Sequence, residues 1–209
     1  MMRLLLASSS PARAATLRAA GIDPLLQPAD LDEDALLRDA AAENGPLTVS
    51  EAVLLLARAK AQTVAATAAA RAADVLVGCD SLLDLDGEPM GKPGTADRAR
   101  ARWLRMRGRT GVLRSGHWVR LRDGRTAGAV SSTTVRFADV SEAEIDAYVA
   151  TGEPLNVAGA FTIDGLGGAF LTGIEGDPHG VVGISLPLLR ELLIGLGVRW
   201  TDLWHPVSP

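Results

Sequence analysis

The sequence predicts an α/β protein built on a mixed β-sheet. Short apolar runs with the length of buried strands alternate with segments whose apolar residues recur at helical spacing. The order of these elements is irregular, and we find no internal repeat and no low-complexity linker. Such an order is typical of α/β folds and not of repeat proteins. The 209 residues suffice for one large domain, or for two lobes that share a core.

The beginning of the chain predicts a strand, a serine-rich turn and a helix. The apolar residues 4–7 are followed by serines at 8–10 and by Pro11, which suits the first position of a helix that we expect to stop at Gly21. The free N–H groups of that helix, its dipole, the serine hydroxyls and the guanidinium of Arg13 would gather at one point. Such a point attracts a phosphate. A capped surface helix that binds nothing is an equally good interpretation of this segment alone.

The middle of the chain predicts further helices and strands in alternation. They are an acidic loop at 30–34, a long amphipathic helix from about 50 to 73, a buried strand at 75–79, a strand at 82–85 with a turn at 86–87, a loop at 91–94, and a helix that ends near residue 106. Ser50 is the expected N-cap of the long helix, and Thr95 or Asp97 caps the later one. Asp80 is expected where the strand at 75–79 ends.

The last third of the chain predicts two long strands, two helices and a glycine-rich stretch. They are strands at 112–121 and 127–137, a short helix that opens with a capping box at 141–144, glycine-rich chain at 158–183, and a helix at 187–196. We expect Trp103 and Cys79 to be packed in the core.

Composition excludes several classes of protein. A formal net charge of −4 gives no basic field for a nucleic-acid backbone. The single cysteine, Cys79, excludes an internal disulfide framework and suits a reducing cytoplasm. The first apolar run is too short for a signal peptide, and no apolar stretch approaches the roughly 20 residues of a membrane span. The composition therefore predicts a soluble cytoplasmic protein that binds neither nucleic acid nor a membrane.

Four charged residues are candidates for the chemistry. Ligands of open α/β sheets bind beyond the carboxyl ends of the strands, where we expect Asp80, although a lone aspartate there is often a turn or cap residue. Lys92 lies in a Gly-Lys-Pro-Gly loop that needs no lysine for packing. Lys60 lies on an otherwise apolar helix side, which indicates either an inward-facing cation or a snorkelling lysine. Glu33 lies in the acidic loop, and carboxylates there would suit Mg²⁺.

Other known motifs do not fit. The segment 87–93 is one residue too short for a phosphate-binding P-loop, and Pro93 stands where a serine or threonine should hold magnesium. The three histidines lack the spacing of metal ligands. The glycines at 165–168 lack the dinucleotide-binding pattern.

In its motifs and their order the chain resembles the Maf family of nucleoside triphosphate pyrophosphatases. The motifs are Leu-Ala-Ser-Ser-Ser-Pro-x-Arg at 6–13, Asp-Leu-Asp-Glu at 30–33, Ala-Lys-Ala at 59–61, Gly-Cys-Asp-Ser at 78–81, Gly-Lys-Pro at 91–93, Ser-Gly-His at 115–117, the segments 148–154 and 158–161, Ile-Glu-Gly-Asp at 174–177 and Val-Val-Gly at 181–183. The resemblance spans nearly the whole chain. It implies a single domain, residues 1–209, with two lobes and a central cleft, similar to the inosine triphosphatase-like (Maf/Ham1) group.

The resemblance also implies an activity and a set of site residues. Members of the family split a nucleoside triphosphate into a monophosphate and pyrophosphate, and they need Mg²⁺ or Mn²⁺. Carried onto this sequence, Asp80 is the general base, Glu33 and Asp80 hold the metal, and the residues that hold the phosphates are Ser8, Ser10, Arg13, Lys60 and Lys92. Lys60 and Lys92 also count as catalytic, because positive charge stabilises a phosphoryl transition state.

The chain departs from the family pattern in three places. The first of two arginines usual after Ser-Pro is Ala12, and Asn156-Val157 replaces a common Asp-Lys. Asp164 stands where the pyrimidine-preferring branch has glutamine. A carboxylate accepts hydrogen bonds where an amide can donate, so Asp164 favours a base that presents N–H groups.

Two functions compete at this point. The first is a house-cleaning hydrolase that removes unwanted or modified nucleoside triphosphates. The second is a nucleotide-binding regulator of septum formation without significant turnover, because family members are also linked to cell division. The retained carboxylates favour catalysis, since a binding protein would not need them. Related proteins often pair, so a homodimer is also an expectation.

Overall fold

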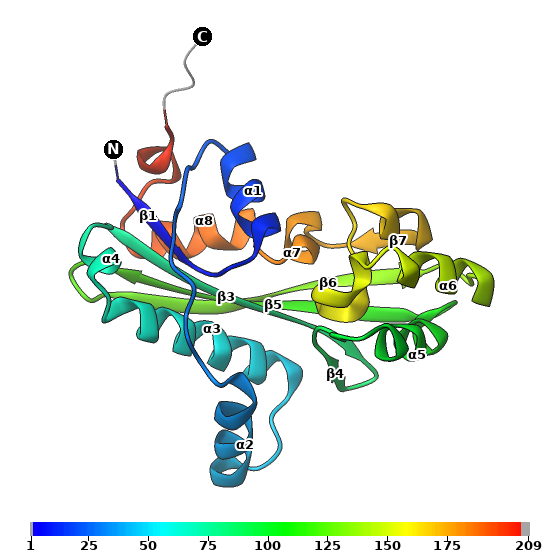
Figure 1. Ribbon diagram of the computed structural model, residues 1–209. Helices are drawn as coiled ribbons and strands as arrows, with labels where there is room; N and C mark the ends of the chain where they lie inside the picture. Colours follow the sequence, from blue (N-terminus) through cyan, green and yellow to red (C-terminus); the bar gives the residue numbers. More distant parts are fainter. Residues whose placement is uncertain (1, 206–209) are drawn as a thin grey trace.

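The computed structural model describes residues 2–205, which form a mixed sheet of seven strands with helices on both faces (Figure 1). The strands are β1 (Leu4–Ala7), β2 (Leu25–Leu26), β3 (Val75–Leu85), β4 (Glu88–Met90), β5 (Thr110–Leu121), β6 (Thr126–Phe137) and β7 (Leu171–Glu175). Their order in the sheet is β2-β1-β3-β5-β6-β7, and β4 also pairs with β3. The predicted α/β class with a mixed sheet is confirmed.

Helices cover the two faces of this sheet in separate groups. The α-helices are α1 (Pro11–Ala19), α2 (Glu33–Asn44), α3 (Val49–Ala65), α4 (Ala68–Arg71), α5 (Ala96–Met106), α6 (Glu142–Ala150), α7 (Pro178–Val182) and α8 (Leu186–Gly195). Helix α3 lies along one face, whereas α1, α7 and α8 lie on the other (Figure 1). Short 3₁₀ turns at Glu153–Asn156, Ala158–Ala160, Leu166–Phe170 and Trp200–Leu203 complete the chain. Within residues 2–205, none of the helices has the length and apolar composition that crossing a membrane requires.

The strand directions make the sheet mixed. Strands β1, β2 and β3 are parallel, whereas β5, β6 and β7 follow β3 in antiparallel order. Strand β5 pairs with β3 without a break from Val75 to Asp84. The parallel strands β1 and β3 need a helical crossover, which contains α1 to α4, whereas the antiparallel strands β5 and β6 are joined by a turn alone.

The edge of β3 opposite β5 has a gap. Strand β1 covers this edge as far as Gly78, which pairs with Ala7. Strand β4 covers it again from Leu83, which pairs with Met90. Residues 79–82 therefore have no neighbouring strand on this edge, and we call this opening the β3 notch. It contains Asp80.

The side chains on either side of the sheet belong to different cores. Cys79 packs with Leu17 of α1 and Leu189 of α8, whereas Ala7 packs with Ala61 of α3. Successive side chains of a strand point to opposite faces, so Asp80 faces α3 while its neighbours face α1. A third core, around Trp103, fills the opposite end of the molecule. Cys79 and Trp103 are fully buried, which confirms both predictions.

Three predicted boundaries were wrong. Asp80 does not end a strand, because continuous pairing with β5 carries β3 through it to Leu85. Helix α3 begins after Thr48 and not at Ser50, since Thr48 and Glu51 form a reciprocal capping box, and it stops at Ala65. Glu33 lies in the first turn of α2 and not in a loop, because the Asp32 side chain accepts a hydrogen bond from Ala35 N and caps the helix.

Candidate active site

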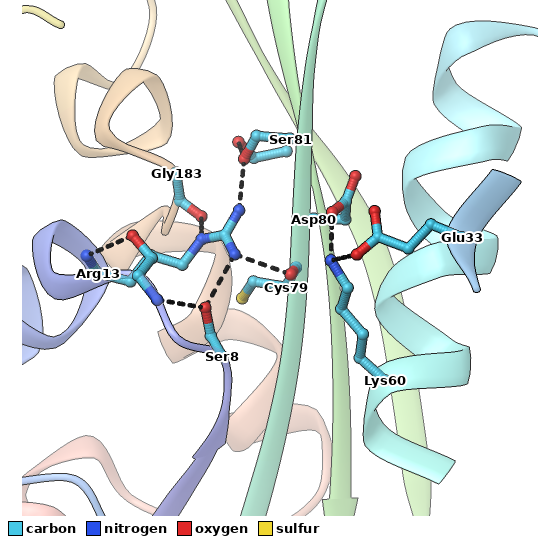
Figure 2. Close-up of polar contacts among 10 residues, drawn as sticks. Ser8, Arg13, Glu33, Lys60, Cys79, Asp80, Ser81 and Gly183 are labelled. Atoms are coloured by element: carbon cyan, nitrogen blue, oxygen red, sulfur yellow. Dashed lines mark hydrogen bonds and ion pairs between the residues drawn. The ribbon is translucent and has the colours of Figure 1, made fainter. Parts of the chain in front are cut away.

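On the α3 face of the sheet, three side chains meet at one nitrogen. Lys60 Nζ lies 2.5 Å from Asp80 Oδ1 and 2.8 Å from Glu33 Oε1 (Figure 2). The lysine comes from α3, the aspartate from β3 and the glutamate from the start of α2. The inward-facing interpretation of Lys60 is confirmed, because its side chain is only 13% exposed. The structure thus brings together three of the residues that the sequence singled out.

Burial and the neighbouring positive charges shift the pKa of Asp80 in opposite directions. Burial raises the pKa of Asp80 above its usual value, and the positive charges of Lys60 and Arg13 partly oppose this shift. A buried carboxylate with a raised pKa is a better proton acceptor than one in water. The ammonium of Lys60 nevertheless favours its ionised form, which is the form that a base needs.

The donor set suits a hard divalent cation whose coordination is completed by substrate. Glu33 and Asp80 each direct a carboxylate oxygen at the same point, where Lys60 Nζ now lies. Among residues 2–205 there is no cluster of three or more His, Cys, Asp or Glu arranged for a metal ion. Mg²⁺ commonly takes one or two protein carboxylates and fills its other positions with water and substrate phosphate. Two converging carboxylates therefore fit Mg²⁺ or Mn²⁺, but not a metal held by protein alone.

On the opposite face, Arg13 joins α1 to three other segments. Its Nε donates to the Gly183 carbonyl at 2.8 Å, and Nη1 donates to the Cys79 carbonyl at 2.9 Å and to Ser8 Oγ at 3.1 Å. Nη2 donates to Ser81 Oγ at 3.0 Å. Figure 2 shows Arg13 and its partners on one side of β3, and Lys60 with its two carboxylates on the other. The β3 notch lies between the two sets.

The serines after β1 border the notch. Ser10 is the N-cap of α1, and its Oγ accepts a hydrogen bond from Arg13 N at 3.4 Å. Ser10 N in turn donates to Ser8 Oγ at 3.1 Å. The predicted serine-rich opening of the helix is therefore confirmed. Ser8 is 8% exposed and lies one residue beyond the end of β1.

Lys92 borders the notch from the other side. It lies two residues beyond Met90, which pairs with Leu83 in the antiparallel β3–β4 ladder. The ladder ends at this pair, so Lys92 follows directly where β4 leaves the edge of β3. Its side chain is exposed, and it makes no ion pair with any residue between 2 and 205.

Asp164 lies elsewhere, at the rim of a surface hollow of about 370 Å³ between α1 and α7. The hollow is lined by Ala12, Ala15, Thr16, Ala19, Ala20, Asp164, His179, Val182 and Leu186. Asp164 is exposed and accepts a hydrogen bond from Thr162 Oγ1. Ala12, which lines the hollow, directly precedes Arg13 in α1.

Sequence reasoning missed the buried partners of Arg13. Ser81 Oγ lies 2.7 Å from Ser115 Oγ, and Ser115 Oγ donates to the Gly180 carbonyl at 2.9 Å. Both serines belong to motifs that carry the resemblance, Gly-Cys-Asp-Ser and Ser-Gly-His, but a serine inside an apolar strand gives no signal of its own. Only the fold reveals that they meet.

Comparison with known proteins shows which family the chain belongs to. The family described as Maf-like protein matches residues 3–196. A protein of Leifsonia xyli subsp. xyli named nucleoside triphosphate pyrophosphatase is 52% identical, over 98% of this chain and 97% of its own length. A protein of the same name from Nocardia farcinica is 56% identical, over 97% of each chain. Among solved structures, the Staphylococcus aureus Ham1 protein matches at 15% identity with a TM-score of 0.40, over 66% of this chain and 72% of that one. The sequence matches, which cover almost the whole chain, establish that this protein belongs to the family of Maf-like proteins.

Proposed function

We propose that this chain hydrolyses a nucleoside triphosphate to the monophosphate and pyrophosphate, with Asp80 as general base. The observation that carries the proposal is the position of Asp80, which is buried and paired with Lys60 at a notch bordered by Ser8 and Lys92. The names of the Leifsonia and Nocardia relatives support the reaction. A protein that only bound nucleotide would have no use for a buried carboxylate paired with a lysine at this notch.

In the proposed reaction, Asp80 takes a proton from water as the water oxygen bonds to the α-phosphorus. The bond from the α-phosphorus to the bridging oxygen breaks, and pyrophosphate leaves with that oxygen. Lys60 holds Asp80 in place and, with Lys92, supplies positive charge against the charge that develops on the phosphates. A divalent cation on the carboxylate oxygens of Glu33 and Asp80 that do not face Lys60 would neutralise phosphate charge beside the ammonium.

The serine end of the site holds the other end of the phosphate chain. Ser8 and Ser10 lie at the start of α1, where N–H groups and the helix dipole favour an anion. Arg13 adds positive charge behind these serines, on the α1 face of the sheet. A triphosphate passing through the notch would thus meet cationic or hydroxyl groups on both faces.

The nucleoside part is proposed to occupy the hollow beside α1. Its lining is largely apolar, which suits a flat base, and Asp164 supplies an acceptor at its rim. A base that presents an N–H group to that carboxylate is therefore favoured over one that presents only acceptors.

Pyrophosphate release from a panel of common and methylated nucleoside triphosphates, with Mg²⁺ and with Mn²⁺, tests the proposal. We expect turnover of at least one nucleotide, and its loss when the metal is chelated. Binding without turnover of any nucleotide would instead support the regulator function and refute hydrolysis. Asp164→Gln, compared with Asp123→Asn at an exposed turn, should change the order of preference among bases without abolishing turnover.

A further inference from the structure

The hydrogen bonds of Arg13 leave little of its guanidinium free for a ligand. An arginine side chain has five N–H groups. Four of them are directed at protein oxygens, namely the carbonyls of Gly183 and Cys79 and the hydroxyls of Ser8 and Ser81. One N–H of Nη2 remains. A side chain held in this way is oriented by the fold and is not free to follow a phosphate.

The hydroxyl of Ser8, unlike most of the guanidinium of Arg13, keeps its hydrogen-bond donor free for a ligand. A serine oxygen can accept two hydrogen bonds and donate one. Ser8 Oγ accepts from Arg13 Nη1 and from Ser10 N, both at 3.1 Å. Its proton must therefore point away from both, and within residues 2–205 it has no acceptor. Ser8 follows directly on the last residue of β1, so this donor lies at the border of the notch.

The direction of each hydrogen bond around Arg13 is fixed by its neighbours. A carbonyl oxygen only accepts, so Ser115 Oγ must donate its proton to the Gly180 carbonyl. In the Ser81–Ser115 contact Ser81 is then the donor, and Ser81 Oγ accepts from Arg13 Nη2. Ser115 is fully buried, so water does not compete for its bond to Gly180. The relay from Arg13 through Ser81 and Ser115 to α7 has one arrangement only.

We propose that Arg13 is a positioning residue that acts through Ser8. By occupying a lone pair of Ser8 Oγ, it turns the hydroxyl proton toward the notch, where Ser8 donates to a phosphate oxygen of the substrate. This inference rests on the proposed function only in naming a polyphosphate as the ligand. It assigns Arg13 a role that its charge alone does not supply, because a lysine could supply the charge but not the four hydrogen bonds.

A double-mutant cycle on Arg13 and Ser8 tests this role. The probe is inorganic tripolyphosphate, and its binding is measured by calorimetry, which requires no turnover. Ser8→Ala should weaken binding about tenfold, since a hydrogen bond to a charged group is lost. Arg13→Lys should weaken it by a similar factor, and the double variant should be no weaker than Arg13→Lys. Independent effects that multiply in the double variant would overturn the proposal, as would an Arg13→Lys variant that binds like the wild type.

The control is Arg18→Lys, the same substitution on the same helix. Arg18 is half exposed and pairs with Asp23 at 3.0 Å, so this variant should bind tripolyphosphate like the wild type. A merely structural role of Arg13 would lower the melting temperature but leave the Ser8→Ala effect intact in the folded fraction. If Arg13→Lys does not fold, Ser81→Ala removes one bond of the same guanidinium, and it should reduce the Ser8→Ala effect. An undiminished Ser8→Ala effect in that background would count against the proposal.

The same measurements separate this inference from the proposed hydrolysis. Coupling between Arg13 and Ser8 in tripolyphosphate binding, without turnover of any nucleotide, would refute the hydrolase and leave the positioning role standing. Turnover of a nucleotide, with independent effects of Arg13 and Ser8 on tripolyphosphate binding, would support the hydrolase and refute the positioning role. A wild-type protein that does not bind tripolyphosphate at millimolar concentration would refute the anion site itself.

Discussion

Lys60 Nζ lies 2.5 Å from Asp80 Oδ1, and this contact joins α3 to the open edge of β3. Both side chains are nearly buried, at 13% and 10% exposure, so each charge depends on the other for its stability. Removal of one partner of such a pair leaves an uncompensated charge in the interior. Substitution of Asp80 and of Lys60 should have different effects on turnover and on stability, since only Asp80 is proposed to move a proton.

Asp80→Asn should remove nearly all turnover and leave the fold intact, because Glu33 still compensates the charge of Lys60. The amide keeps the size of the side chain but cannot take a proton from water. Since a general base contributes about 10²–10⁴-fold to the rate, the variant should fall at least a hundredfold in pyrophosphate release. Its circular dichroism spectrum should match that of the wild type. Asp123→Asn at the exposed β5–β6 turn is the control. Full activity of Asp80→Asn would remove Asp80 from the base role.

Lys60→Met should destabilise the metal-free protein, and a divalent cation should restore it. The substitution leaves Asp80 and Glu33 facing each other without a cation, at a cost of about 3 kcal/mol in the free energy of unfolding. Mn²⁺ should then raise the stability of the variant more than that of the wild type, where the ammonium already occupies the position. Urea unfolding with and without Mn²⁺ measures both effects.

Lys92→Met serves as the stability control for this experiment, because Lys92 is exposed and forms no ion pair with a residue between 2 and 205. It should unfold like the wild type at every Mn²⁺ concentration. An equal effect of Mn²⁺ on the wild type and on Lys60→Met would show that the cation does not bind where Lys60 lies.

Elements with strong local signals could be predicted from the sequence. The run 4–7 before Pro11, the two long strands β5 and β6, and the capping box at 141–144 follow from short-range rules, and the structure confirms them. Helix α7 lies in the glycine-rich stretch and has no such pattern. It is held instead by the Asp177 side chain, which caps it, and by Ser115 and Arg13, which bind its carbonyls.

The residues of the site could be predicted, but their arrangement could not. The motifs singled out Asp80, Lys60 and Glu33, and the structure brings all three together. The position of Asp80 inside a strand depends on pairing with β5, which is distant in sequence. The gap that exposes it depends on where two other strands end. Neither is a property of the residues around Asp80.

Gly78→Ala should lower both stability and turnover, because α3 packs directly on β3 at this position. A Cβ at Gly78 would lie 2.1 Å from the Ala57 carbonyl oxygen, so α3 would have to move away from the sheet. Overpacking of this kind costs about 1–3 kcal/mol. The movement would also carry Lys60 away from Asp80, so pyrophosphate release should fall even where the variant is fully folded.

Gly195→Ala is the matched control for Gly78→Ala. A Cβ there meets no heavy atom within 4 Å, and the residue lies at the end of α8. Alanine is the better helix former, so this variant should be as stable as the wild type or slightly more so. If Gly78→Ala retained full turnover with all its protein folded, the close packing of α3 on β3 would not be what holds Lys60 against Asp80.

The stability of the protein should fall between pH 6.5 and pH 4 because of His117. Its ring is fully buried, with Nδ1 donating to the Ser115 carbonyl at 3.0 Å and Nε2 accepting from Ser185 N at 2.9 Å, so the neutral form fits. Burial is the main cause that lowers the pKa of His117 from 6.5 to about 4. In this range the unfolded chain binds a proton that the folded chain does not, so acid favours unfolding.

The lowered pKa of His117 corresponds to about 3 kcal/mol in the free energy of unfolding, which is lost progressively as the pH falls. His117→Gln should be less stable than the wild type at pH 7, but its stability should change less with pH. Urea unfolding at pH 7, 6 and 5 measures this difference, since equal slopes for His117→Gln and the wild type would mean that His117 is not the group that titrates.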